Sequence, residues 1–331
     1  MTNVPQTALP QEALLRVDDL AVAFASGGGE ALAVDGVSFV LRRGETLCLV
    51  GESGCGKSAT AMSVLRLLPV STGRIARGRV LFGGFDLAQL PERQLEHIRG
   101  NRIGMVFQEP MTALNPVFRI GDQIAEPLRV HRKLTQKEAY ARAAALLDEV
   151  GIPDATKRLR DFPHQMSGGM RQRVMIAMAM ACEPELVIAD EPTTALDVTI
   201  QGQVLHLLTR LTRDRGNALL LITHDLGVVH ETADRVAVMY SGKIVEEAGK
   251  KELFAEPKHP YTRGLILSRP RLDPAGRHDR LPSIRGVVPS PSKRPTGCAF
   301  RDRCGEAVPE CATPPPYKQI GPERFCRCWR V

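Results

Sequence analysis

The sequence predicts an α/β fold with a parallel sheet at its centre. Three short apolar segments, at residues 47–50, 186–189 and 218–223, lie far apart in the 331-residue chain and are separated by segments with helical spacing. Apolar strands that alternate with helices indicate a parallel sheet covered on both faces. Residues 13–50 alternate as strands do, and residues 109–165 are mainly helical. We therefore expect an antiparallel β subdomain and a helical subdomain in addition to the sheet core.

The overall composition is that of a soluble globular protein, with 24% charged and 43% hydrophobic residues. The longest uninterrupted apolar run, residues 174–182, is far shorter than the roughly 20 residues that a spanning helix needs. Residues 1–12 lack the basic and apolar regions of a secretory signal and are expected to be a flexible tail. We therefore expect a cytoplasmic chain that reaches a membrane only through partners.

Residues 256–331 differ in composition from the rest of the chain. They hold 13 of the 24 prolines and five of the eight cysteines, so we expect an irregular extension without a large core. Residues 269–303 carry nine Lys and Arg against three Asp and Glu, which supplies +6 of the net charge of +7. This basic stretch is either a partner-facing surface or a contact for anionic lipid. The rest is nearly neutral and aromatic residues are only 5%, so a general nucleic-acid surface is not indicated.

The clearest chemical motif is Gly51-Glu-Ser-Gly-Cys-Gly-Lys57-Ser58, which matches G-x-x-x-x-G-K-[ST] between a predicted strand and a predicted helix. Its glycines let several backbone N–H groups point at one phosphate, and the helix adds its N-terminal dipole. Lys57 is expected to contact the β- and γ-phosphates, and Ser58 to ligate Mg²⁺. Cys55 is either a small residue that contributes its amide or a thiol whose alkylation blocks nucleotide binding.

Two further motifs contain groups that could act on a bound phosphate. Asp190 and Glu191 follow an apolar strand, and the carboxyl ends of parallel strands face the crevice where ligands bind. Asp190 would hold Mg²⁺, and Glu191 would polarise the attacking water. Ser167 would cap a helix that begins Ser-Gly-Gly, whose N–H groups and dipole could bind a second anion. On these residues alone, an ordinary capped helix is the simpler interpretation.

The order of these motifs resembles the ATP-binding subunit of ABC transporters, a branch of the P-loop NTPases. The matching positions are Gly51–Ser58, Gln108, Ser167-Gly168-Gly169, Asp190-Glu191, residues 195–197 and His224. The resemblance covers residues 13–255 as a nucleotide-binding domain, with the helical subdomain at about 109–180. It implies a head-to-tail pair in which the phosphate loop of one chain and the signature of the other enclose one ATP.

The resemblance implies a role for each matching residue. Phe24 would stack on adenine, and Asp197 would line the dimer seam. The implied Mg²⁺ ligands are Ser58, Gln108 and Asp190, and the implied catalytic residues are Lys57, Gln108, Glu191 and His224. The ATP-binding set comprises Phe24, Gly51, Ser53, Gly54, Cys55, Gly56, Lys57, Ser58, Ala59, Gln108 and His224. The signature that would reach the partner's ATP comprises Ser167, Gly168, Gly169, Arg171 and Gln172, preceded by Met166 where Leu is usual.

Residues 256–331 resemble the tail of the oligopeptide/dipeptide importer ATPases, in which four cysteines can hold an iron–sulfur cluster. The matching segments are residues 259–263, 281–286 and 297–304, and the matching cysteines are Cys298, Cys304, Cys311 and Cys328. Their spacing lacks the C-x2-C pattern of many zinc sites, which favours a [4Fe–4S] cluster over zinc or free thiols. Cys326 competes for the fourth place, but the family pattern has an aromatic or His after the last ligand, as Trp329 follows Cys328.

These resemblances imply the ATP-hydrolysing subunit of a di- or oligopeptide importer, peripheral to the cytoplasmic face of the membrane. The implied partners are a second ATPase subunit, usually a different chain, two transmembrane permeases and an extracytoplasmic peptide-binding protein. Glutathione and nickel chelates are alternative cargoes among such transporters. A soluble ABC ATPase acting on nucleic acid fits the near-neutral core less well. A sensor without sustained hydrolysis fits less well because Glu191 and His224 are intact.

Overall fold

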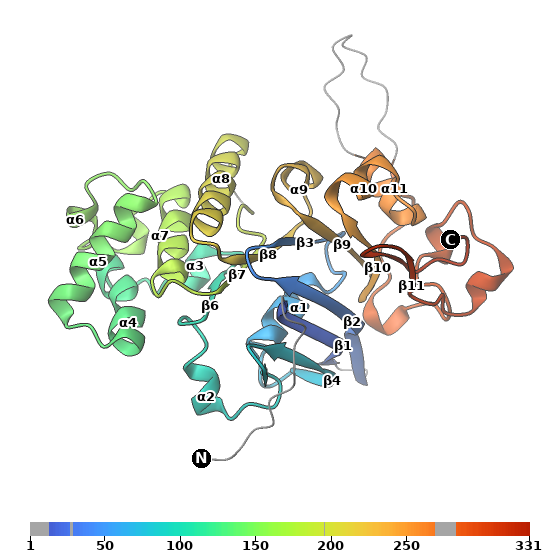
Figure 1. Ribbon diagram of the computed structural model, residues 1–331, viewed down its shortest axis with the longest axis horizontal. Helices are drawn as coiled ribbons and strands as arrows, with labels where there is room; N and C mark the ends of the chain where they lie inside the picture. The colour runs from blue at the N-terminus through green and yellow to red at the C-terminus, as the bar shows by residue number, and fades with distance from the viewer. Residues whose placement is uncertain (1–12, 27–28, 195, 269–282) are drawn as a thin grey trace, which may run out of the picture. The chain divides into compact units, whose positions relative to one another are not determined.

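The computed structural model has helices and strands in the alternating order of an α/β protein (Figure 1). It describes residues 13–26, 29–194, 196–268 and 283–331. The described chain divides into two units. Unit 1 comprises residues 13–15, 41–46 and 82–222, and unit 2 comprises residues 16–40, 47–81 and 223–331. The expected tail at residues 1–12 and the first part of the basic stretch, residues 269–282, lie outside the described residues.

Unit 1 contains a parallel sheet of β6 (Ile103–Val106), β7 (Leu186–Asp190) and β8 (Ala218–Thr223). β7 is the middle strand and pairs in parallel with both neighbours. Every residue of β7 and β8 is buried, as expected of strands that are covered on both faces. The prediction of a parallel sheet with apolar strands at these positions is confirmed.

The helices of unit 1 lie mainly in the region that was expected to be helical. They are α2 (Glu92–Glu96), α3 (Pro110–Ala113), α4 (Ile120–Arg132), α5 (Gln136–Glu149), α6 (Ala155–Arg158), α7 (Gly168–Met180) and α8 (Val198–Asp214), with a 3-10 turn at Pro163–Gln165 and the short strand β5 (Phe85–Asp86). α4, α5 and α7 pack against one another (Figure 1). α5 begins with a capping box, because Thr135 Oγ1 accepts from the Glu138 N–H and the Glu138 carboxylate accepts from the Thr135 N–H.

Unit 2 contains two sheets. In one, the strand order is β2 (Gly29–Arg42), β1 (Ala13–Ser26) and β4 (Gly73–Phe82), as expected from the alternation in residues 13–50. In the other, β9 pairs in parallel with β3 and antiparallel with β10. The elements of this second part are β3 (Thr46–Val50), α1 (Lys57–Val64), α9 (Leu226–Thr232), β9 (Arg235–Tyr240), β10 (Lys243–Gly249), α10 (Lys250–Ala255) and α11 (Pro260–Leu267).

The C-terminal extension is more regular than its proline content predicts. β12 (Arg324–Cys326) pairs antiparallel with β10, and β11 (Lys318–Gly321) pairs with β12. The remainder has 3-10 turns at Pro291–Lys293, Arg301–Arg303 and Pro309–Ala312. The edge of β10 would otherwise present unpaired N–H and C=O groups, which β12 satisfies. The expectation of an irregular extension is therefore wrong for this hairpin.

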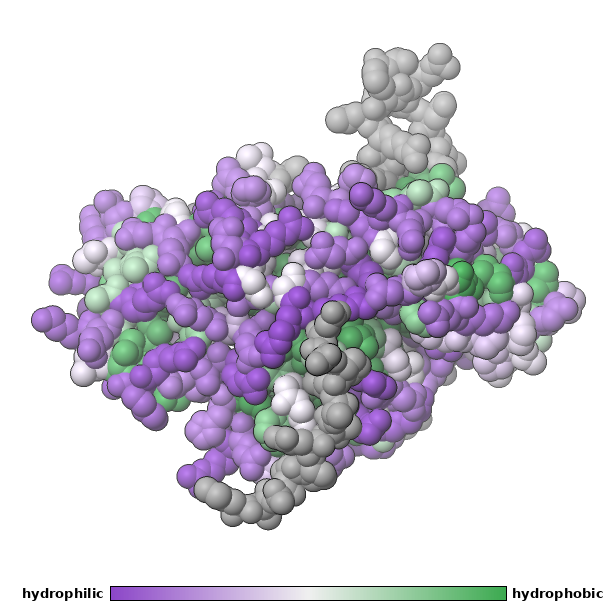
Figure 2. Space-filling view, viewed as in Figure 1, coloured by the Kyte–Doolittle hydropathy of each residue, from purple (hydrophilic) through white to green (hydrophobic). Residues whose placement is uncertain are grey.

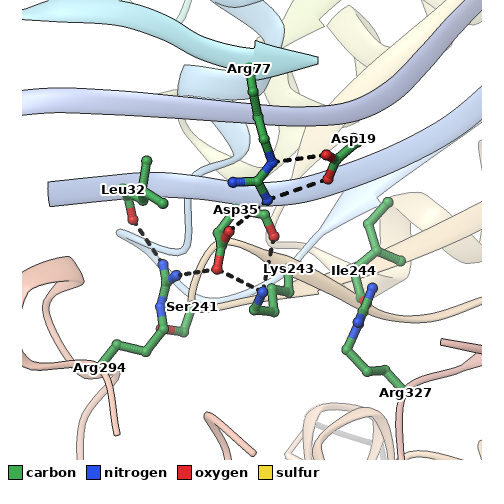
Figure 3. A network of polar contacts seen from close by, with 9 residues as sticks. All are labelled: Asp19, Leu32, Asp35, Arg77, Ser241, Lys243, Ile244, Arg294 and Arg327. Carbon is green, nitrogen blue, oxygen red and sulfur yellow. Dashed lines mark hydrogen bonds and ion pairs between the residues drawn. The ribbon is translucent and has the colours of Figure 1, made fainter. Parts of the chain in front are cut away.

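A cluster of ion pairs also attaches the extension to the rest of unit 2 (Figure 3). Asp35 in β2 accepts from Arg77 at 3.0 Å, from Lys243 at 2.7 Å and from Arg294 of the extension at 3.2 Å. Arg294 also donates to the Leu32 carbonyl oxygen at 2.9 Å. Burial works to raise the pKa of Asp35, but Lys243 and the two arginines outweigh it and hold that pKa below its usual value. The carboxylate is thus charged and joins β2 to three other segments of the chain.

Most of the face shown in Figure 2 is hydrophilic, and apolar side chains interrupt it in small groups. The apolar residues are concentrated instead in the sheet strands, and every residue of β3 and β9 is buried. Within the described residues, we find no helix that combines the length and the apolar composition needed to cross a bilayer.

His259 is a buried group at the start of α11. Its Nδ1 accepts from the Tyr261 N–H at 3.1 Å, and its own backbone N–H donates to Glu246 at 2.8 Å. The side chain is 1% exposed. Burial, with a smaller contribution from nearby Arg263, lowers the pKa of His259 to about 3. The imidazole is therefore neutral at pH 7 and acts as a helix cap.

His259 should make stability fall as the pH falls below about 6.5. The unfolded chain takes up a proton at that pH, whereas the folded chain resists protonation down to a pKa of about 3. Between pH 7 and pH 5, the parental protein should lose roughly 2 kcal/mol more stability than His259→Asn, which keeps a capping acceptor. Urea unfolding at both pH values measures the difference. Parallel losses in the two proteins would contradict the assignment.

Candidate functional site

The predicted phosphate loop lies in unit 2, between β3 and α1. Gly56 caps α1 with φ +104°, and a Cβ there would lie 2.6 Å from the Ala33 carbonyl oxygen. At Gly51, a Cβ would lie 2.2 Å from the Met239 carbonyl oxygen. Both positions therefore require glycine, because two neighbouring strands pack directly against the loop backbone. The predicted strand–loop–helix arrangement is confirmed.

Lys57 is buried and lies against the backbone of the loop. Its Nζ donates to the Gly51 carbonyl oxygen at 2.8 Å and to the Glu52 carbonyl oxygen at 3.1 Å. Ser58 follows it in the first turn of α1. The ammonium group is thus held at the loop, where phosphate oxygens would make stronger, charge-assisted hydrogen bonds than carbonyl oxygens do.

Cys55 is buried in the same loop, and its carbonyl oxygen accepts from the Gly242 N–H at 2.8 Å. Burial raises the pKa of its thiol, although Lys57 opposes the effect. A protonated, buried thiol is a weak nucleophile. Of the two interpretations of Cys55, the structure favours the small residue whose backbone helps to form the loop.

Two other candidate residues of unit 2 lie outside the loop. Phe24 in β1 is half-buried, and a Cβ at Gly73 would come within 2.9 Å of its ring. His224 follows β8 directly and is exposed. Both positions leave part of the side chain accessible to a ligand.

In unit 1, Gln108 and the pair Asp190-Glu191 lie at one edge of the parallel sheet. Gln108 follows β6, Asp190 ends β7, and these strands are parallel neighbours, so the three side chains follow the same carboxyl edge. Asp190 is buried and Gln108 is half-buried. This is the edge at which open α/β sheets bind ligands.

Glu191 has a feature that the motif did not predict. Its φ is +43°, in the left-handed region that costs a non-glycine residue about 1–3 kcal/mol. The surrounding structure holds it there, because its N–H donates to the Ile222 carbonyl oxygen at 2.9 Å and Thr194 Oγ1 donates to its carboxylate at 3.1 Å. The expected role of Glu191 as the general base remains a prediction.

The signature segment forms the beginning of α7, as predicted. Ser167 is the N-cap, and its Oγ accepts from the Met170 N–H at 3.3 Å. Ser167 and Gly168 are exposed, whereas a Cβ at Gly169 would lie 2.9 Å from the Ile200 side chain. Of the remaining residues, Met166 and Gln172 are buried, and Arg171 Nε donates to the Pro163 carbonyl oxygen at 2.8 Å.

Asp197 has a local role in unit 1. It caps α8, and its Oδ1 accepts from the Ile200 N–H at 3.0 Å. The residue is exposed. Its expected place in a dimer seam remains a prediction, and residue 195 of the same motif lies outside the described residues.

The cysteines of the extension lie in unit 2. The Cys298 N–H donates to the Cys311 carbonyl oxygen at 2.9 Å. Burial raises the pKa values of Cys298 and Cys304, and the neighbouring Cys311 and Cys328 add to both shifts. Cys326 instead lies opposite Glu246 in the sheet. In the part of the chain that the structure describes, no three His, Cys, Asp or Glu side chains are arranged to hold a metal ion.

Two side chains that touch the phosphate loop were not assigned a role from the sequence. Tyr261 of α11 and Arg303 of the extension both contact Glu52, the second residue of the loop. They lie 209 and 251 positions away along the chain, so no local pattern could connect them to the loop.

A strand–loop–helix unit with this glycine geometry defines a P-loop nucleotide-binding protein, and a capped Ser-Gly-Gly helix in the same chain is typical of ATP-binding cassettes. Residues 34–194 match the family described as "ABC transporter", and residues 245–311 match "Oligopeptide/dipeptide transporter, C-terminal region". The chain belongs to the ABC transporter ATPase family.

Relatives and solved structures agree with this assignment. The chain is 52% identical over 318 residues to the probable peptide ABC transporter ATP-binding protein y4tR of Sinorhizobium fredii, covering 96% of this chain and 95% of the relative. It is 49% identical over 319 residues to the dipeptide transport ATP-binding protein DppD of Bacillus subtilis, with the same coverages. The solved dimer of the cassette MJ0796 with ADP and Pi is 26% identical, with a TM-score of 0.64, over 71% of this chain and 98% of that one.

Gly56→Ala should lower the affinity for MgATP by at least about tenfold, because the required backbone conformation alone costs about 1–3 kcal/mol and the new Cβ meets Ala33. Equilibrium titration of the full chain with MgATP measures the effect. Gly202→Ala in α8 is the control, since a Cβ there meets nothing within 4 Å. It should bind normally and gain up to about 1 kcal/mol of stability. Unchanged affinity in Gly56→Ala would contradict the loop geometry.

Proposed function

We propose that this chain binds and hydrolyses MgATP and uses that cycle to drive the import of di- or oligopeptides through partner permeases. The observation that carries the proposal is the glycine-dependent phosphate loop with Lys57 held against it. The relatives that match nearly the whole chain are named as peptide-transport ATP-binding proteins, which supports the choice of cargo class.

In the nucleotide site, the loop amides and the N-terminus of α1 bind the phosphates together with Lys57. Ser58, Gln108 and Asp190 supply a hydroxyl, an amide oxygen and a carboxylate, which are the oxygen donors that Mg²⁺ prefers. The ion would neutralise charge on the phosphates. Glu191 accepts a proton from the attacking water, and His224 holds the γ-phosphate.

A second ATPase subunit, a different chain in our proposal, completes the site. Ser167 and Gly168 are exposed at the N-terminus of α7, where the helix dipole favours an anion. There Ser167 and Gly169 contact the γ-phosphate of the ATP bound to the other subunit. To change the ratio of two conformations from 1:99 to 99:1, the nucleotide must bind the favoured conformation more tightly by about 5.5 kcal/mol. A γ-phosphate that both subunits contact can supply this difference, because hydrolysis removes it.

The permease partners require a docking surface on this chain. Several large apolar side chains close to Gln108 in the sequence are exposed, namely Phe107, Met111, Val117 and Phe118. Exposed apolar side chains that gather into one patch mark interaction sites. We assign them to a transmembrane permease, which places the chain at the cytoplasmic face of the membrane. An extracytoplasmic peptide-binding protein would deliver the cargo.

We also propose that Cys298, Cys304, Cys311 and Cys328 bind a [4Fe–4S] cluster. The support is that Cys304, Cys311 and Cys328 are near enough to Cys298 to raise the pKa of its thiol, and that the Cys298 N–H donates to the Cys311 carbonyl oxygen. Cysteine thiolates are the ligands that would hold such a cluster. Such a cluster would cross-link a segment that has little core of its own.

The cluster proposal predicts brown protein after anaerobic purification, with about four iron and four sulfide per chain. Cys304→Ser should lower the iron content and the visible absorbance, whereas Cys326→Ser should leave both unchanged. Elemental analysis and absorbance spectroscopy measure these quantities. Zinc without iron, or thiols that titrate freely with no metal, would contradict the cluster.

Glu191→Gln should bind ATP but hydrolyse it roughly 100-fold more slowly, because a positioned general base contributes about 10²–10⁴ to the rate. The variant should accumulate as an ATP-bound dimer with its partner, measured by size-exclusion chromatography and phosphate release. Lys57→Ala is the comparison, and it should lose nucleotide binding altogether. Turnover by Glu191→Gln at the parental rate would show that the base is assigned wrongly.

A further inference from the structure

Glu52 is the residue of the phosphate loop at which the C-terminal part of the chain makes contact. Its backbone N–H donates to Tyr261 Oη at 2.9 Å, and its carbonyl oxygen accepts from Lys57 Nζ at 3.1 Å. Its carboxylate accepts two hydrogen bonds from Arg303, at 2.7 Å from Nη1 and at 3.0 Å from Nη2. One residue is therefore held at its amide, its carbonyl and its side chain, and one of these contacts is the phosphate-binding lysine.

The surroundings of Arg303 fix its guanidinium group, which holds the Glu52 carboxylate in one orientation. Its side chain is only 6% exposed, and its Nε donates to the Arg285 carbonyl oxygen at 2.7 Å. The guanidinium also lies over the Tyr240 ring, with 5.7 Å to the centroid. Because the planar guanidinium is already fixed in this way, it makes both hydrogen bonds to the carboxylate with little further loss of rotamer freedom.

Tyr261 is fixed in a comparable way and contacts the backbone of Glu52. It is fully buried, and its ring packs against Tyr240 and Phe300 with centroid separations of 4.7 Å and 5.4 Å. Phe300 belongs to the extension, close to Arg303 in sequence. The hydroxyl that accepts from the Glu52 N–H is therefore fixed by an aromatic cluster to which the extension contributes.

We propose that Arg303 and Tyr261 are positioning residues of the nucleotide site, so that the C-terminal extension sets the affinity of the phosphate loop for the triphosphate. By holding Glu52, they fix the first turn of the loop and the carbonyl that orients Lys57. Loss of either contact frees the loop to move, and nucleotide binding must then order it again. The inference rests on the proposed ATP-binding function and deepens it.

The test is MgATP affinity in the purified full-length chain. Arg303→Ala should bind about tenfold more weakly, which corresponds to about 1.4 kcal/mol. Glu52→Gln, which keeps the side-chain shape and so preserves the fold, should lose a similar amount. Because the two residues act through one contact, the double variant should lose no more than the worse single variant. Tyr261→Phe should weaken binding as well.

Arg263→Ala is the matched control. It removes another arginine ion pair of the same extension, to Glu306 at 2.6 Å, which does not touch the loop. Its affinity should stay within about twofold of the parental value, which is below 0.5 kcal/mol. In the assembled transporter, Arg303→Ala should raise the KM for ATP far more than it lowers kcat.

The outcomes separate the two proposals. If the parental chain binds no MgATP, the proposed function fails. If it binds and Lys57→Ala does not, but Arg303→Ala and Glu52→Gln bind as the parental chain does, the positioning role is wrong. Additive losses in the double variant, or an equal loss in Arg263→Ala, would also overturn it, since they would reflect general destabilisation.

Discussion

The nucleotide site depends on how closely the backbone of two strands approaches the phosphate loop. The Met239 carbonyl of β9 and the Ala33 carbonyl of β2 occupy the space where side chains at Gly51 and Gly56 would project. Glycine is needed at both positions because a Cβ would clash with these carbonyl groups and because the backbone conformation favours glycine. The loop is therefore shaped by the sheets of unit 2, and its amides do not have to be ordered entirely by the ligand.

The parts of the structure that were predictable from sequence are those in which a local pattern has a single physical cause. The strands β3, β7 and β8 were evident because continuous apolar runs are buried on both faces. The caps at Thr135 and Ser167 were evident because side-chain acceptors satisfy the first N–H groups of a helix. The hairpin β11–β12 was missed, because its stability comes from pairing with the distant edge of β10.

The candidate site was likewise predictable only where a local motif identified its residues. Motifs identified the residues with chemical functions, but not the backbone strain at Glu191, which depends on the Ile222 carbonyl in the next strand. Nor could they identify the contacts that Tyr261 and Arg303 make with Glu52. The spacing within a motif identifies the residues that bind a ligand. The residues that hold the motif in place can lie anywhere in the sequence, because the fold brings them together.

The extension is better understood as a support for the loop than as an appended segment. An arginine on a flexible tail would lose about 2 kcal/mol of rotamer entropy when it bound a carboxylate, which would cancel most of the gain. Here the pairing of β12 with β10 and the Arg294–Asp35 ion pair already hold the extension in place. The coupling free energy between two sites is the same in both directions. If Arg303 increases the affinity of the loop for nucleotide, then bound nucleotide stabilises the docked extension by the same free energy. ATP binding and the docking of the cysteine-containing segment are therefore linked through Glu52.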